Sequence, residues 1–149
     1  MKYIQELLSN RILIISITGW AVAQILKTII NFGFTKKLDP ERLVGSGGMP
    51  SSHSATVCAL SCSTAYSYGI GSFEFALAAI FTIVVMYDAI GVRRETGVQA
   101  VLLNKMVEVF SSMEGFPTTE AKLKELVGHT PIQVLAGAIV GIVVAYLMK

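Results

Sequence analysis

Apolar residues gather in four long stretches of this chain, over residues 12–34, 54–70, 73–92 and 131–148. Each stretch is close to the roughly 20 residues that an α-helix needs to cross a bilayer. The second is rich in Ser, Ala and Cys, and Gly137 and Gly141 lie one turn apart in the fourth. Small residues at such spacing are typical of helices that pack closely inside a membrane bundle. The pattern therefore predicts an all-α integral membrane helical bundle with about four transmembrane spans, forming one domain over residues 1–149.

Residues 97–113, between the third and fourth stretches, have a different pattern. Their apolar residues recur at helical spacing, opposite a polar face that contains Gln99, Lys105 and Glu108. This pattern predicts an amphipathic helix that lies at the membrane interface or dips into it.

The start of the first stretch also has features of a signal peptide. Lys2 and Arg11 precede the apolar run, and "AVAQ" at 21–24 is similar to a small-residue cleavage site. Because the apolar run continues to Phe34, we predict a retained first span.

Composition agrees with a membrane protein and limits the classes of partner. The chain is 53% hydrophobic and only 15% charged, and its mean hydropathy is +0.63. A net charge of +2 with mixed signs predicts no nucleic-acid partner. Cys58 and Cys62 lie one turn apart in an apolar helix, which indicates packing residues, and no Cys or His spacing favours a metal site. We expect the lipid bilayer as the main partner, and a bundle this slim is compatible with a homodimer.

The alternation of spans brings the polar residues to one membrane face. If each span crosses once, the ends of the first and third spans lie on the same face as the starts of the second and fourth. His53 opens the second span, Asp88, Arg93 and Arg94 end the third, and His129 immediately precedes the fourth. This convergence predicts a functional site at that face.

The local sequence at this face favours an anion. "GGMPSSHSA" at 47–55 and "HTP" at 129–131 place both histidines at the starts of helices, where backbone N–H groups lack partners. Helix N-termini bind anions through these groups and the helix dipole. With the Arg pair nearby, whose guanidinium groups match phosphate bidentately, the pattern predicts a phosphate site.

Lys27 and Asp88 each allow two interpretations. Lys27 lies seven residues inside the end of the first span, about 10 Å deep at 1.5 Å per residue. An intramembrane lysine is a functional candidate, although its long side chain can also snorkel to the interface. Asp88 is either a chemical group or one half of a structural ion pair. With histidines that only cap helices, the same chain would serve as a non-catalytic membrane adaptor or small transporter subunit.

Two motifs resemble those of the type 2 phosphatidic acid phosphatase superfamily. "PSSHSA" at 50–55 is similar to its Pro-Ser-Gly-His motif, with Ser52 in place of Gly. "GHTPIQVLAGAIVG" at 128–141 is similar to its last motif, in which an Asp follows the nucleophilic His by four residues; here that Asp is Gln133. Together with "YDAIGVRRETGVQAVLLN", the chain resembles the small, divergent membrane branch of this superfamily over residues 27–141, although the Lys-x6-Arg-Pro motif is not present as such.

The resemblance implies a lipid phosphate phosphatase that works through a phosphohistidine, with no metal and no cofactor. It implies that His129 attacks phosphorus and that His53 protonates the leaving oxygen. Either Gln133 or Asp88 would orient the nucleophile. The implied phosphate-binding residues are Lys27, Ser51, Ser52, Arg93 and Arg94. Hydropathy disfavours a soluble haloperoxidase of the same superfamily.

Basic residues outside the spans predict that the motifs face the cytoplasm. The face with the motifs carries eight of them: Lys36, Lys37, Arg42, Arg93, Arg94, Lys105, Lys122 and Lys124. The opposite face carries three: Lys2, Arg11 and Lys149. By the positive-inside rule, the protein is then a multi-pass cell-membrane protein with its site inside. Such a site would meet phosphatidylglycerol phosphate or phosphatidate, whereas an outward-facing site would favour an isoprenoid diphosphate.

Overall fold

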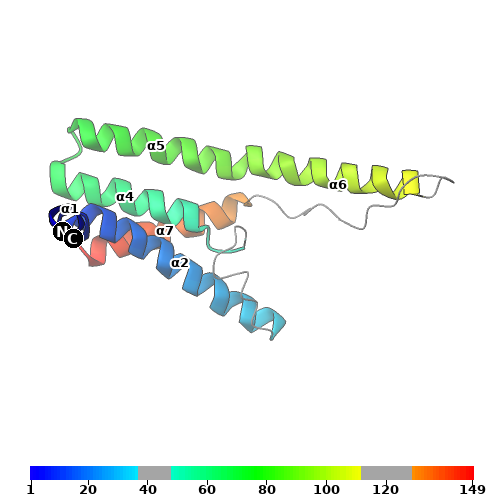
Figure 1. Ribbon diagram of the computed structural model, residues 1–149, viewed down its shortest axis with the longest axis horizontal. Coiled ribbons are helices and arrows are strands. Elements are labelled where there is room, and N and C mark those ends of the chain that lie inside the picture. The colour runs from blue at the N-terminus through cyan, green and yellow to red at the C-terminus, as the bar shows by residue number, and fades with distance from the viewer. Residues whose placement is uncertain (37–47, 112–128) are drawn as a thin grey trace.

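A computed structural model describes residues 1–36, 48–111 and 129–149, except for the side chains of residues 92–94 and 111. Its helices are α1 (Lys2–Ser9), α2 (Arg11–Thr35), α4 (Ser52–Tyr68), α5 (Phe73–Ile90), α6 (Val92–Ser111) and α7 (Pro131–Leu147) (Figure 1). No strand occurs in these three segments. The predicted all-α class is therefore confirmed for the described residues.

Helix α4 is the inner helix of the bundle, packed against α2, α5 and α7. Its closest neighbour is α7, in which a Cβ on Gly137 would meet the carbonyl oxygen of Ser51 and a Cβ on Gly141 would meet that of Ala55. On the α2 side, a Cβ on Gly19 would lie 3.0 Å from the Cβ of Ala59. These glycines let the helix backbones approach closely, which confirms the packing interpretation of the glycine pair in α7.

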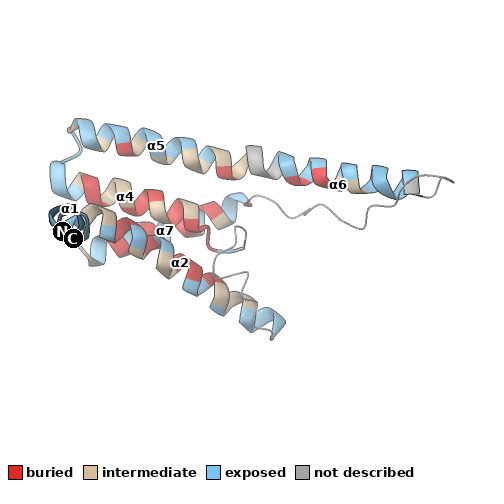
Figure 2. Ribbon diagram, viewed as in Figure 1, coloured by how far each residue is buried: buried red, intermediate tan, exposed pale blue. Residues whose placement is uncertain are grey.

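Helix α5 lies on the outside of the bundle, and only Ala78 and Ala89 are buried along it (Figure 2). Its link to α4 includes hydroxyl contacts, since Thr82 Oγ1 lies 2.8 Å from Ser61 Oγ and 2.9 Å from the carbonyl oxygen of Val57. Most of its large apolar side chains face outward, as expected of a helix whose other face meets lipid.

Helix α6 continues the line of α5 beyond the rest of the bundle (Figure 1). The predicted third span and the predicted amphipathic segment form one continuous helix over Phe73–Phe110. Gly91 keeps right-handed helical dihedrals, its N–H donates to the Tyr87 carbonyl at 2.9 Å, and its own carbonyl accepts from Glu95 N–H at 3.1 Å. At 1.5 Å per residue the rod is about 57 Å long, well beyond the roughly 30 Å of a hydrocarbon core. An interfacial position for α6 stays a prediction.

Two of the predicted spans are long and apolar enough to cross a membrane by length and composition. They are α2 and the α5–α6 rod. The other two stretches form shorter helices of 17 residues each, α4 and α7, at the lower limit of spanning length. The count of four spans therefore stays a prediction.

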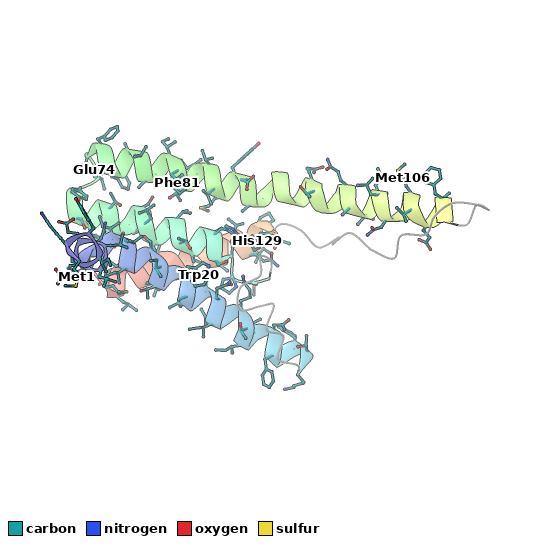
Figure 3. The ribbon with its side chains drawn as sticks, in the orientation of Figure 1. Met1, Trp20, Glu74, Phe81, Met106 and His129 are labelled. Carbon is teal, nitrogen blue, oxygen red and sulfur yellow. The ribbon has the colours of Figure 1, made fainter. Side chains whose placement is uncertain are left out.

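The helices alternate in direction, so the bundle has two distinct ends. Met1 and Glu74 mark one end, and His129 lies at the other (Figure 3). The first end also holds the C-terminus, where Arg11 Nη2 donates to the carbonyl oxygen of Met148 at 2.8 Å. The second end collects the starts of α4 and α7, as the alternation of spans predicts.

Candidate functional site

The starts of α4 and α7 are joined to each other by their backbones. Ser51 N–H donates to the carbonyl oxygen of Gln133 at 2.9 Å. Ser51 also caps α4, with Oγ accepting from Ser54 N–H at 3.4 Å, and Thr130 caps α7. These caps place His53 in the first turn of α4 and His129 just before α7. The two rings lie edge to face with centroids 6.0 Å apart.

His129 is held in place on two sides. It is only 2% exposed, and its backbone N–H donates to the carbonyl oxygen of Ala89, near the end of α5, at 3.1 Å. Its Nδ1 lies 3.3 Å from Gln133 Oε1. Ring and backbone are thus both fixed before any substrate binds.

The tautomer of His129 follows from the partners of Gln133. Gln133 Oε1 also accepts from the backbone N–H of Thr130 at 3.0 Å, so the amide oxygen, not the nitrogen, faces the ring. An oxygen acceptor requires Nδ1 to carry the hydrogen, which leaves the lone pair on Nε2. Gln133 therefore makes two contacts here, since it completes the capping box of α7 and its amide oxygen accepts from the His129 ring.

Lys27 reaches the same end of the bundle from α2. It is 2% exposed, and its Nζ donates to Gln24 Oε1 at 2.6 Å and to Ser52 Oγ at 3.5 Å. The ammonium group lies inside the bundle, beside the first residue of α4, so the snorkelling interpretation is wrong. A buried cation next to a helix N-terminus is a strong local attraction for an anion.

Gln24 also belongs to the candidate site, although it was not predicted from the sequence. It is 4% exposed and holds the Lys27 ammonium through the short bond described above. The signal was a Gln three residues before Lys27, on the same helix face, within an otherwise apolar run. In the sequence this residue ends the "AVAQ" run at 21–24, which is similar to a cleavage site.

The predicted site residues near the α5–α6 junction, Asp88, Arg93 and Arg94, are only partly described. Asp88 is half-buried and precedes Ala89, whose carbonyl accepts from His129. Arg93 and Arg94 begin α6, but their side chains lie outside the described part of the chain. Their contribution to phosphate binding stays a prediction, as do the nucleophilic role of His129 and the choice between Asp88 and Gln133 as its main support.

The gathered groups fit an anion. They are two imidazoles, one ammonium, two serines and two helix N-termini. Among the described residues, no three His, Cys, Asp or Glu side chains gather as metal ligands. What the arrangement can do chemically is hold a phosphoryl group between a fixed imidazole and a second proton-carrying ring.

Comparison with known proteins places this chain in a family. The chain is 42% identical over 152 residues, covering 96% of each chain, to a Bacillus subtilis (strain 168) protein named "Uncharacterized membrane protein YuiD". No solved structure matches this chain. The model of the divergent PAP2 family matches residues 8–144. That match covers nearly the whole bundle, including both histidine motifs, and the chain therefore belongs to the divergent PAP2 family.

Proposed function

We propose that this protein is a membrane lipid phosphate phosphatase that hydrolyses a phosphomonoester through a phosphohistidine on His129. The observation that carries the proposal is the 6.0 Å separation of the His53 and His129 rings at two adjoining helix N-termini. Membership of the divergent PAP2 family supports the same chemistry. The two candidate spans and the membrane relative support a location in the bilayer.

In the first step, Nε2 of His129 attacks phosphorus, since Nδ1 is turned to Gln133. The N–P bond forms as the P–O bond to the lipid breaks, and His53 gives its proton to the leaving oxygen. If phosphorus lies about 3 to 3.5 Å from Nε2 of His129, the leaving oxygen stays within hydrogen-bond reach of the His53 ring. In the second step, water gives a proton to His53 and attacks the phosphohistidine, releasing phosphate and free His129.

Charge at the site stabilises the transferring group. Lys27 contributes a buried ammonium beside Ser52, and the first backbone amides of α4 lack carbonyl partners within the helix. Arg93 and Arg94, at the start of α6, would add bidentate contacts. Preorganised donors of this kind stabilise developing negative charge on the phosphoryl oxygens.

His129→Ala tests the nucleophile. We expect phosphate release from phosphatidate or phosphatidylglycerol phosphate to fall by on the order of a thousandfold or more. The protein should still fold, although loss of a buried, hydrogen-bonded ring should lower its stability by about 1 to 3 kcal/mol. Ile139→Ala, at an exposed position of α7, the helix that follows His129, is the control and should stay within about twofold of wild type. Wild type incubated with ³²P-labelled lipid should carry an acid-labile, base-stable label that His129→Ala lacks. Normal turnover by a folded His129→Ala protein would exclude the phosphohistidine, and no turnover by wild type on either lipid would favour the adaptor alternative.

We also propose that the site faces the cytoplasm, on the basis of the basic residues counted above. With Cys58 and Cys62 replaced by Ala, a Cys substituted at exposed Met49 should resist a membrane-impermeant thiol reagent in intact cells. A Cys substituted at Ile70, which is exposed at the opposite end of the bundle, should react. The reverse pattern would contradict this orientation and would bring isoprenoid diphosphates forward as substrates.

A further inference from the structure

The first helix presents an unpartnered apolar face at the end of the bundle opposite the histidines. Helix α1 has no buried residue. Its large apolar side chains are all highly exposed, at 83% for Tyr3, 63% for Ile4, 58% for Leu7 and 68% for Leu8. At 100° per residue these four lie on one side of the helix, opposite Lys2, Gln5 and Ser9.

Helix α1 runs crosswise to the bundle. In Figure 3 it is seen end-on beside Met1, whereas α2, α4, α5 and α7 run across the picture. Asn10 makes the corner: its extended backbone ends α1, and its side-chain oxygen accepts from Leu13 N–H at 3.1 Å to cap α2. Arg11 then ties this corner to Met148. If α2 crosses a bilayer, α1 lies in the plane of its surface.

Aromatic residues mark the same level independently. Four of the five tyrosines of the chain lie at this end: Tyr3, already counted on α1, and the three independent residues Tyr66, Tyr68 and Tyr146. All four are at least 50% exposed, and the Lys149 ammonium lies 4.0 Å from the ring centroid of Tyr146. Tyrosines are enriched where hydrocarbon meets the lipid headgroups.

We infer that α1 is an interfacial helix whose apolar face inserts into the lipid headgroup boundary on the side of the membrane opposite the phosphatase site. The inference rests on the proposed membrane location. The neighbouring cations Arg11 and Lys149 match anionic lipid headgroups, whereas Lys2 pairs with Glu6 of the same helix at 3.9 Å. Leu7 and Leu8 would reach the upper acyl chains. The helix thereby fixes how deep α2 sits, and with it the level of Lys27 at the other end.

The test uses tryptophan quenching in proteoliposomes of brominated phospholipid and anionic lipid. Leu7→Trp places a probe on the apolar face and Gln5→Trp places the matched control on the polar face, each in a Trp20→Phe background. We expect lipids brominated near the headgroup end of the acyl chain to quench the Leu7→Trp probe about threefold more than the Gln5→Trp probe. Aqueous iodide should show the reverse order. If Leu7→Trp disturbs the helix content, Ile4→Trp reports on the same face.

Native Trp20 separates failure of the inference from failure of the proposed membrane location. Trp20 is 41% exposed and lies in α2, the candidate span that follows α1. If bromolipid fails to quench Trp20 in the parent protein, the membrane location is wrong. If Trp20 is quenched but the Leu7→Trp probe is open to iodide, α1 does not insert. If that probe is shielded from both quenchers, a protein surface such as a second copy covers α1, which also overturns the inference.

Discussion

Helices α4 and α5 are neighbours in sequence and in space, yet they differ in composition and in burial. Helix α4 is rich in Ser, Ala, Thr and Cys and has eight buried residues among its 17, whereas α5 is strongly apolar and has two among its 18, both alanines (Figure 2). In a soluble protein the more apolar helix would be the inner one. Here the order is reversed.

The reversal is what a lipid solvent predicts. Lipid tails are as apolar as a leucine side chain, so apolar residues gain little by leaving them, and close contact between backbones drives association instead. Gly137 and Gly141 of α7 provide that contact with the backbone of α4. The same closeness brings the starts of α4 and α7 together, so the packing that stabilises the bundle also assembles the two histidines.

Breaking the close contact should have the largest effect. Gly141→Ala puts a Cβ into the Ala55 carbonyl oxygen and the Ala59 amide of α4. We expect it to lower the free energy of unfolding by about 1 to 3 kcal/mol, and Gly141→Leu to prevent folding. Thermal unfolding in detergent micelles measures this.

Gly33→Ala is the matched control, because nothing lies within 4 Å of its Cβ position on α2. It should be neutral or should stabilise the helix by up to about 1 kcal/mol. Since Ala has the higher helix propensity at both positions, an equal change at the two glycines would mean that the backbone contact at Gly141 does not decide the stability of the bundle.

Much of the packing was readable from the sequence, because spacing of small residues is a local signal. The four apolar stretches became α2, α4, α5 and α7. Helix α4 begins at Ser52, two residues before the predicted start at residue 54, because Ser51 is its N-cap. The join between the third span and the amphipathic segment lies at Gly91, which keeps helical dihedrals because its backbone hydrogen bonds are made.

The site was less predictable where it depends on tertiary contacts. The convergence of His53 and His129 followed from topology alone. The burial of Lys27 did not, because a long side chain can reach either the interface or a neighbouring helix, and only the position of Ser52 decides between them. The second role of Gln133 needed the capping geometry of α7.

A smaller effect should separate the two supports of the nucleophile. If Asp88 supplies negative charge to His129, Asp88→Asn should lower kcat by about a hundredfold, and Gln133→Ala should lower it by about tenfold, with about 1 kcal/mol of stability lost through the α7 cap. Gln133→Asp should be tolerated or improve activity. The reverse order of the two losses would make Asp88 structural and the Gln133 amide sufficient. Rates are compared on one lipid phosphate at saturating substrate.

The smallest effect on activity concerns the inner face of α2, where Gln24 accepts a hydrogen bond from Lys27. Gln24→Leu removes the 2.6 Å acceptor of the ammonium. We expect a loss of about 1.5 to 3 kcal/mol at most in stability, as for hydrogen bonds to charged groups, and up to about tenfold in kcat/KM. Thr28→Val, which removes only a side-chain bond to the carbonyl oxygen of Gln24, is the control on the same helix.

Gln24→Glu distinguishes positioning from packing. A carboxylate at this position still accepts from Lys27, so stability should stay near that of wild type, but it neutralises the buried cation. We therefore expect inhibition by inorganic phosphate or vanadate to weaken about tenfold in Gln24→Glu, with KM rising more than kcat falls. A structural role alone would leave the inhibition constant unchanged in this variant. Unchanged inhibition together with normal turnover would remove Gln24, and the Lys27 ammonium that it holds, from the phosphate site.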